Sequence, residues 1–180
     1  MSSYYYFLSQ LPYLNLEQKP PMSSSEFMTL AQSLMSKEDA AFLERLSIGS
    51  SDVSSDASSD TSVAGGYAES LPSTGCDFID GWREWERALR LNIAKQRAIL
   101  LKKDSSSVIE PPCVPADAAS AAYKAVTGDG SPLDSEFLID KARWNAIETL
   151  AGIGYFDRNQ AFAYFLKLLL LERRQSFNID

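Results

Sequence analysis

Histidine is absent from this 180-residue chain, and that absence excludes a large group of catalytic mechanisms. Histidine is the commonest general base near neutral pH and the commonest ligand of transition metals, so most hydrolase and metalloenzyme schemes lose their central residue. The chain also lacks a GxxxxGK[ST] phosphate-binding loop and a GxSxG nucleophile motif. We therefore expect no catalytic, cofactor-binding or metal site, and no small-molecule substrate.

Cysteine and positive charge are both scarce. Cys76 and Cys113 form no CxxC pair, so neither a zinc site nor a disulfide framework is indicated, and we expect reduced thiols in a cytoplasmic protein. The 17 Lys and Arg residues are outnumbered by 24 Asp and Glu residues, which leaves a net charge of -7. Binding to nucleic acid or to anionic lipid needs clustered positive charge, so we expect no nucleic-acid partner. The N-terminus has no basic region and carries Pro12 soon after its apolar residues, unlike a secretory signal.

No hydrophobic run is long enough to span a bilayer. The longest lies in a predicted C-terminal helix, Asp157 to Phe177, but it is shorter than the roughly 20 residues that a span needs, and Lys167 lies near its middle. At helical spacing, only Gln160, Lys167 and Arg174 form a polar stripe along this helix. A helix that is apolar around most of its circumference is buried in a protein core or in a contact between subunits.

Capping signals and helical periodicity predict an all-α fold. Ser23 with Glu26 forms a capping box, Ser36 is followed by Asp39, and Ser131 precedes a proline in the first helical position. The predicted helices run from Ser23 to Met35, Ser36 to Gly49, Asp77 to Lys103, Ala116 to Val126, Ser131 to Ala151, and Asp157 to Phe177. We predict a single-domain helical bundle over residues 1–180, with a long Trp-rich helix. The short turn Gly152–Gly154 makes the last two helices an antiparallel hairpin.

Three segments lie outside the predicted helices. Tyr4 to Leu16 is aromatic and broken by a proline, so we expect an extended or one-turn segment that docks its rings onto the body. Ser47 to Gly75 (residues 47–75) is rich in Ser, Asp and Gly and predicts a flexible loop, a reading that we favour over a calcium or phosphorylation site. Val108 to Pro115 contains three prolines and predicts a connector.

Two helices carry a broad apolar face. In the long helix the predicted buried stripe consists of Phe78, Trp82, Trp85, Leu89, Ile93 and Leu100. In the helix that begins at Ser131 the apolar members are Phe137, Leu138, Ala142, Trp144, Ile147 and Leu150. Asn92 and Gln96 lie on or beside the first stripe. They are either satisfied core amides, which we favour, or groups that face a groove filled by a partner.

Charged residues on otherwise buried helices are the polar groups that we expect to matter most. They are Asp140, Arg143, Lys167, Glu172, Arg173 and Arg174. Such a charge usually pairs internally or reaches solvent along its own stem, and we favour internal pairing. The alternative is that the cations anchor a partner, because Arg and aromatic residues are enriched at interface hot spots. The candidate partner-binding residues are Arg143, Trp144, Lys167, Arg173 and Arg174.

Four segments together resemble a known family. They are Tyr4 to Leu14, Glu84 to Ala98, Leu138 to Leu150, and Phe156 to Asn178. In order and spacing they are similar to a family of uncharacterised proteins encoded in bacterial V-type ATP synthase operons. The serine-rich segment from Ser47 to Gly75 departs from that pattern.

The resemblance implies a non-catalytic component that associates with subunits of a bacterial V-type ATP synthase. In such operons the gene lies where the gene for the C-type subunit is expected, which implies a C-type element that couples the central stalk to the membrane rotor. The protein would then be cytoplasmic and peripheral to the inner membrane through the rotary complex. The alternative is a soluble helical adaptor or assembly factor that is not stably part of the complex.

An enzyme that uses paired carboxylates is a third hypothesis, and helix spacing disfavours it. Glu84 with Glu86, and Asp134 with Glu136, are two residues apart and point to different helix faces. Ser120 and Lys124 fit an SxxK pattern, but in an alanine-rich surface helix they are ordinary i,i+4 neighbours.

Overall fold

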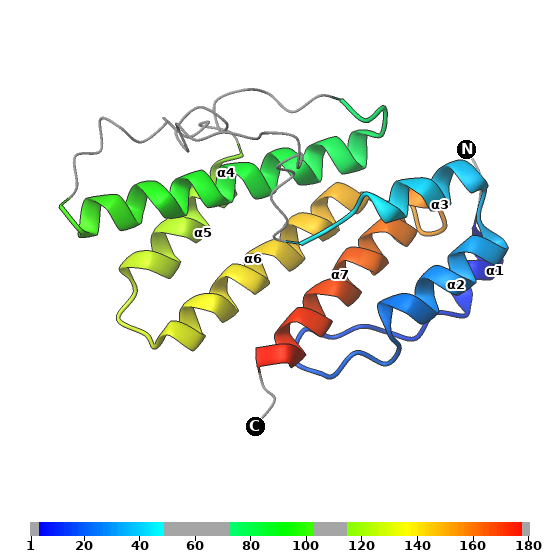
Figure 1. Ribbon diagram of the computed structural model, residues 1–180, viewed down its shortest axis with the longest axis horizontal. Coiled ribbons are helices and arrows are strands. Elements are labelled where there is room, and N and C mark those ends of the chain that lie inside the picture. Colours follow the sequence, from blue (N-terminus) through cyan, green and yellow to red (C-terminus); the bar gives the residue numbers. More distant parts are fainter. Residues whose placement is uncertain (1–3, 49–72, 103–114, 178–180) are drawn as a thin grey trace, which may run out of the picture. The chain divides into compact units, whose positions relative to one another are not determined.

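The computed structural model describes residues 4–48, 73–102 and 115–177, and within them the protein forms seven helices and no strand (Figure 1). The predicted all-α fold is therefore confirmed. Two compact units emerge, residues 4–48 with 144–177 and residues 73–102 with 115–143. The single-domain expectation stays a prediction. Cys113, nearly all of the predicted loop at 47–75 and most of the connector at 108–115 lie outside the described residues.

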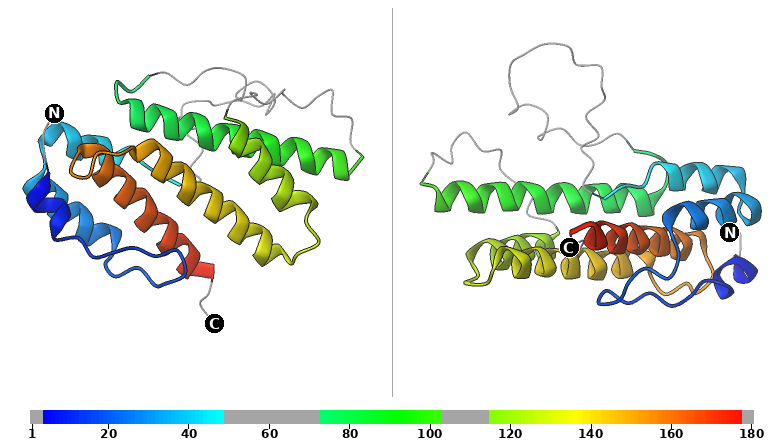
Figure 2. Two further views of the ribbon diagram at one scale, coloured as in Figure 1. Left: turned by 180° about the vertical axis from the view of Figure 1, so that it is seen from behind. Right: turned by 60° about the horizontal axis from the view of Figure 1, so that its bottom comes forward.

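The second unit is built on helix α4 (Asp77–Leu100), which packs against α5 (Ala116–Thr127) (Figures 1 and 2). The inner face of α5 consists of the buried alanines Ala118, Ala122 and Ala125. Their small side chains lie one turn apart on one face, so the two helix backbones can approach closely. The indole Nε1 of Trp85 donates to Asp117 across this contact at 2.9 Å. The first part of α6 (Pro132–Ala151) completes the unit.

The predicted stripe of α4 is correct at its start and wrong at its end. The members from Phe78 to Leu89 are buried, whereas Leu100 is 58% exposed. The helix ends at Leu100 rather than at Lys103. Periodicity marks the face of α4 that could be buried, but burial at each position depends on whether another segment packs there.

Asn92 is a satisfied core amide, the reading favoured from the sequence. It is 8% exposed, and its Nδ2 donates to the carbonyl oxygen of Ala88 at 2.8 Å, one turn earlier in α4. Gln96 lies one turn later and is partly exposed. The apolar stripe of α4 therefore accommodates a polar group because the helix backbone satisfies it.

The first unit contains α1 (Tyr5–Ser9), α2 (Ser24–Leu34), α3 (Lys37–Glu44), the last part of α6, and α7 (Arg158–Phe177). The predicted capping box is confirmed, because the Ser23 side chain accepts from the Glu26 amide while the Glu26 carboxylate accepts from the Ser23 amide. Ser36 caps α3 by accepting from the Asp39 amide. Contrary to prediction, α3 ends at Glu44, and Gly49 lies outside the described residues.

Phe27 lies at the centre of this unit and is fully buried. Its ring centroid lies 5.4 Å from those of Phe7, Tyr164 and Phe165. Most large apolar residues of α7 are buried as predicted, namely Phe162, Phe165, Leu166, Leu168, Leu170 and Leu171. One aromatic ring of α2 thus joins the N-terminal segment to α7.

Two further observations concern α7. In the described part of the chain, no helix combines the length and apolarity that crossing a bilayer requires. The contacts of Lys167 with Trp144 and Glu148 bring the end of α6 against α7. Beyond these contacts, the predicted antiparallel hairpin stays a prediction. Gln160 Nε2 donates to the Gly152 carbonyl at 3.5 Å, in the turn before α7.

Candidate functional site

The N-terminal segment lies along the polar stripe of α7 (Figure 1). The backbone amide of Tyr4 donates to the Phe156 carbonyl at 2.8 Å, just before α7 begins. Further along, the Tyr164 hydroxyl donates to the Pro12 carbonyl at 2.9 Å, and Arg174 donates to the Leu16 carbonyl at 3.4 Å. The edge of α7 that is most polar in sequence is therefore overlaid by another part of the same chain.

The front of this segment is firmly anchored. Tyr4 is 7% exposed, and its hydroxyl bonds to the carboxylate of Asp39, which also faces Arg158 at 3.7 Å. Phe7 is 2% exposed and packs on Phe27. A one-turn segment that docks its rings is thus observed for Tyr4 and Phe7. Tyr5 is 62% exposed, although its ring contacts that of Phe156, and docking is not observed for Tyr6 and Tyr13, which are 70% and 88% exposed.

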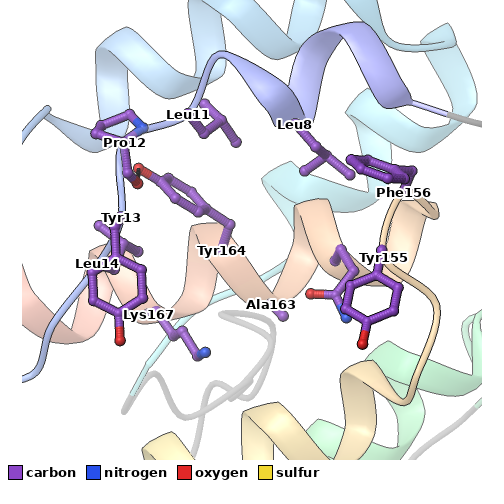
Figure 3. Close-up of a pocket in the computed structure, with 11 residues that line it drawn as sticks. Leu8, Leu11, Pro12, Tyr13, Leu14, Tyr155, Phe156, Ala163, Tyr164 and Lys167 are labelled. Carbon is purple, nitrogen blue, oxygen red and sulfur yellow. Dashed lines mark hydrogen bonds between the residues drawn. The ribbon is translucent and has the colours of Figure 1, made fainter.

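A groove of about 260 Å³ opens between the segment and α7 (Figure 3). Its lining residues are Leu8, Leu11, Pro12, Tyr13, Leu14, Tyr155, Phe156, Gln160, Ala163, Tyr164 and Lys167. The walls are mainly aromatic and aliphatic, and Gln160 and Lys167 contribute an amide and an ammonium group. Such a lining suits an aromatic or aliphatic side chain of a binding partner, with a polar group beside it.

Lys167 forms a small cluster with two residues of α6. Its Nζ donates to Glu148 Oε1 at 2.9 Å and lies 4.7 Å from the centre of the Trp144 ring. The Trp144 indole donates to the same carboxylate oxygen at 3.0 Å. Internal pairing, the reading favoured from the sequence, therefore holds for Lys167, although its side chain still lines the groove.

Tyr164 is the residue of the groove whose acidity is most altered. Burial disfavours its charged form and raises its pKa from 10.0 to about 12. We expect an alkaline titration followed by tyrosinate absorbance to contain one late step near pH 12, and we expect Tyr164→Phe to remove it. Because the unfolded chain ionises at lower pH, this group stabilises the fold fully below pH 10, and that contribution is lost as the pH rises towards 12. Persistence of the late step in Tyr164→Phe would contradict the assignment.

A second groove, of about 480 Å³, lies on another side of α7. It is lined by Met28, Leu43, Glu44, Leu46, Ser47, Ile48, Phe165, Leu169 and Arg173. The guanidinium of Arg173 also lies 5.8 Å from the centre of the Phe177 ring. The predicted partner-binding residues Arg173 and Lys167 therefore belong to different grooves.

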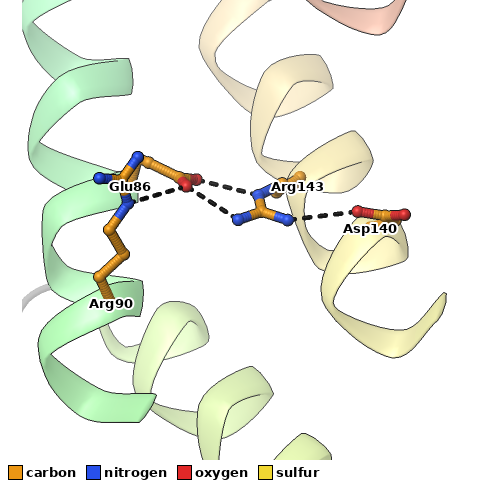
Figure 4. A network of polar contacts seen from close by, with 4 residues as sticks. All are labelled: Glu86, Arg90, Asp140 and Arg143. Carbon is orange, nitrogen blue, oxygen red and sulfur yellow. Dashed lines mark hydrogen bonds and ion pairs between the residues drawn. The ribbon is translucent and has the colours of Figure 1, made fainter. Parts of the chain in front are cut away.

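Arg143 lies in a buried ionic network of the second unit (Figure 4). Its Nε and Nη2 donate to the two carboxylate oxygens of Glu86 at 3.0 and 2.8 Å, and its Nη1 donates to Asp140 at 3.2 Å. Arg90 approaches the same Glu86 at 3.3 Å. Arg143 is 6% exposed, so in this structure it ties α6 to α4 rather than offering a charge to a partner.

The network shifts the acidity of its members. Burial disfavours the charged form of Glu86, but the hydrogen bonds and charges of Arg143 and Arg90 outweigh it and hold the pKa of Glu86 below its ordinary 4.5. Burial likewise opposes the charge of Arg143, and its two carboxylate partners outweigh that effect and raise its pKa. Both ends of the bidentate pair are therefore ionised at neutral pH.

The five predicted partner-binding residues do not form one site. Trp144 and Lys167 lie together, Arg174 binds the N-terminal segment, Arg173 lines the second groove, and Arg143 belongs to the other unit. The aromatic residues that form the first groove were not proposed as a site. Their signal was the density of tyrosines in residues 4–14, with Tyr155 and Phe156 in the turn before α7.

Comparison with known proteins returned nothing. No protein-family model, curated protein or solved structure matches the chain significantly. Within the described ranges, no group of three or more His, Cys, Asp or Glu side chains could hold a metal ion. The function must therefore be inferred from the geometry of the first unit, residues 4–48 with 144–177, and from the resemblance of the four sequence segments.

Proposed function

We propose that this protein works by binding another protein, as a non-catalytic component associated with a bacterial V-type ATP synthase. The observation that carries the proposal is the open groove between the N-terminal segment and α7, with exposed aromatic side chains at its rim. Within that association, the more specific proposal is a C-type element that couples the central stalk to the membrane rotor.

Exposed aromatic side chains around the groove support a protein partner. Tyr13 and Tyr155 are 88% and 83% exposed and both line it, while Ile153, in the turn before α7, is 96% exposed. The Tyr5 ring lies 4.5 Å from that of Phe156. Tyrosine is enriched at interface hot spots because it combines a large apolar ring with a polar end. Apolar residues that gather in this way mark interaction sites more often than scattered ones do.

Charge and resemblance narrow the class of partner. The net charge of -7 favours a partner surface of opposite sign. The likeness of four segments to proteins encoded in V-type ATP synthase operons supplies the identity of that partner. Under the same proposal, the protein functions in the cytoplasm and reaches the membrane only through the rotary complex.

Copurification from native bacterial membranes tests the proposal. We expect a tagged chain to retain the A, B and D subunits of the ATP synthase, and we expect Tyr155→Ala to reduce the retained amount at least about fivefold. Tyr123→Ala is the matched control, because Tyr123, on α5, is also exposed, at 56%, and does not line the groove. Failure of the unaltered chain to retain any of these subunits would refute the association.

An adaptor or assembly factor is the alternative, and stoichiometry separates it from a permanent component of the complex. A coupling element should be present in a fixed ratio to the D subunit in the purified active complex. An assembly factor should be found only with partial complexes and be absent from the finished one.

A further inference from the structure

We propose that residues 8–16, which we call the flap, open and close over the polar stripe of α7 and thereby control access to it. The regulatory part of this proposal rests on the proposed function above, whereas the opening itself is a property of the free chain. Three observations support the proposal: few polar contacts hold the flap, a groove lies between the flap and α7, and the residues on both sides of the flap are anchored.

Few polar contacts hold the flap to α7. Its carbonyl groups accept one bond from Tyr164 and one longer bond from Arg174. No backbone amide of residues 13–16 donates to another described residue. Leu14, 6% exposed, is its one fully buried side chain, and Leu8, Leu11 and Leu16 are half-buried. A segment with one fully buried side chain and few backbone bonds belongs to the low-stability end of a fold.

The groove lies beneath the flap rather than beside it. Five flap residues line one wall, and Gln160, Ala163, Tyr164 and Lys167 of α7 line the other. Figure 3 shows the Tyr164 hydroxyl pointing across this space to Pro12. At the groove the flap does not touch the helix, so lifting it breaks mainly the burial of Leu14 and the two side-chain bonds to its carbonyl groups.

The flanks of the flap are anchored, so it can move without detaching the N-terminus. On one side, Tyr4 is bonded to Phe156 and Asp39, and Phe7 is buried against Phe27. On the other side, the capping box at Ser23 fixes the start of α2. Opening would uncover the faces of Tyr164 and Lys167, which belong to the stripe that the sequence marks as the polar edge of α7.

The hydroxyl group of Tyr164 holds the flap closed, and a variant that lacks only this oxygen atom tests its role. Its ring is stacked on Phe27 and should stay in place in Tyr164→Phe, while the bond that its hydroxyl donates to the Pro12 carbonyl at 2.9 Å is lost, along with the contact to the alternative acceptor Met22 Sδ at 3.7 Å. Loss of one such bond should raise the open population about fivefold. Tyr13→Phe removes the same atom from a flap ring that is 88% exposed, and serves as the matched control.

Limited proteolysis of the free chain by chymotrypsin, read by mass spectrometry as cleavage after Tyr13 or Leu14, measures the opening, because the protease must take up a lifted, extended flap. In the unaltered protein we expect cleavage here to be at least about tenfold faster than cleavage within α7, with little dependence on denaturant. Tyr164→Phe should accelerate flap cleavage about fivefold, and Tyr13→Phe, which keeps an aromatic cleavage site, less than about twofold. Flap cleavage no faster than cleavage within α7, with both rising together as denaturant is added, would overturn the opening even if the variant failed to fold.

The copurification assay then tests the control of binding. If the groove must widen to admit the partner, Tyr164→Phe should retain more ATP synthase subunits than the unaltered chain. Tyr6→Phe, whose ring is 70% exposed and does not line the groove, should change the amount less. Faster flap cleavage with unchanged retention would overturn the regulatory part and leave the opening intact. Failure of every chain to retain subunits would instead refute the proposed function, so the two failures are distinguishable.

Discussion

Replacing Arg143 by methionine should destabilise the protein by about 3–5 kcal/mol, the largest effect that we expect from a charge substitution. The change leaves Glu86 and Asp140, which are 5% and 4% exposed, without their shared cation. Arg90 still reaches Glu86, but its side chain is 33% exposed and its bond is the longer one, so it compensates only in part. Urea unfolding followed by circular dichroism, at constant m-value, measures the loss.

Two control variants distinguish the loss of the buried ionic network from a general effect of removing a positive charge. Lys141→Met removes the same charge from an exposed position two residues away in α6, and we expect a change within about 0.5 kcal/mol. Combining Arg143→Met with Glu86→Leu and Asp140→Leu should recover most of the stability, because an apolar replacement of a whole buried ion cluster is often neutral or stabilising. A single substitution that costs less than about 1 kcal/mol would contradict the burial of this network.

The sign of the pH dependence gives a further check on Arg143. In the unaltered chain the pKa of Glu86 is below 4.5, so its contribution is present above pH 4.5 and is lost as the pH falls through the folded value. Without Arg143, burial dominates and raises that pKa, so protonation of Glu86 stabilises the variant. The difference in unfolding free energy between the two chains should therefore be smaller at pH 4 than at pH 7. A larger difference at pH 4 would contradict the assignment.

Local signals predicted the helices well because they depend on neighbouring residues. The capping box at Ser23 and the helix start at Ser131 satisfy backbone amides within one turn, and both are present in the structure. Helix ends were harder to predict. The residues of α4 around Leu100 repeat the helical pattern, but nothing in that pattern shows whether another segment packs on them.

The face that α6 buries could not be predicted from apolar spacing alone. Leu138 was expected on the apolar face and is 42% exposed, whereas Asp140 and Arg143 are buried. Their burial depends on Glu86, which is 57 positions away from Arg143 in sequence. A charge on a helix becomes a core residue only when a distant partner of opposite sign meets it, and the sequence order does not contain that information.

The groove escaped prediction for a similar reason. Each wall looks ordinary in sequence, one an aromatic N-terminus and the other the polar edge of α7. The two walls form a groove only because Pro12 and Tyr164, 152 positions apart in sequence, lie within hydrogen-bonding distance of each other. Helical spacing correctly identified the stripe of Gln160 and Lys167, but it could not show that the chain's own N-terminus lies over it.

Replacing Phe27 by alanine should cost about 3–5 kcal/mol, comparable to the loss of Arg143. Phe27 is fully buried, and three rings from two other segments of the chain contact it, Phe7 of the N-terminal segment and Tyr164 and Phe165 of α7. The substitution leaves a cavity at the point where α2, α7 and the N-terminal segment meet, and Tyr164 and Phe165 lose the ring on which they stack. Thermal and urea unfolding measure the effect.

Leu30→Ala is the matched control for Phe27, because Leu30 lies on the same helix and is 37% exposed. We expect it to cost less than about 1.5 kcal/mol, since part of its surface already faces water. Equal losses in the two variants would contradict the central position of Phe27.

The alanine variant at Phe27 should also change the behaviour of Tyr164. The Tyr164 ring loses the ring on which it stacks, and water entering the cavity removes part of the desolvation that raises its pKa to about 12. The late tyrosinate step should therefore move towards 10.0, and chymotrypsin should cleave the flap faster even though Tyr164 keeps its hydroxyl. If the step and the cleavage rate stay unchanged while stability falls, Phe27 supports only the helix packing, and α7 alone holds Tyr164 in place.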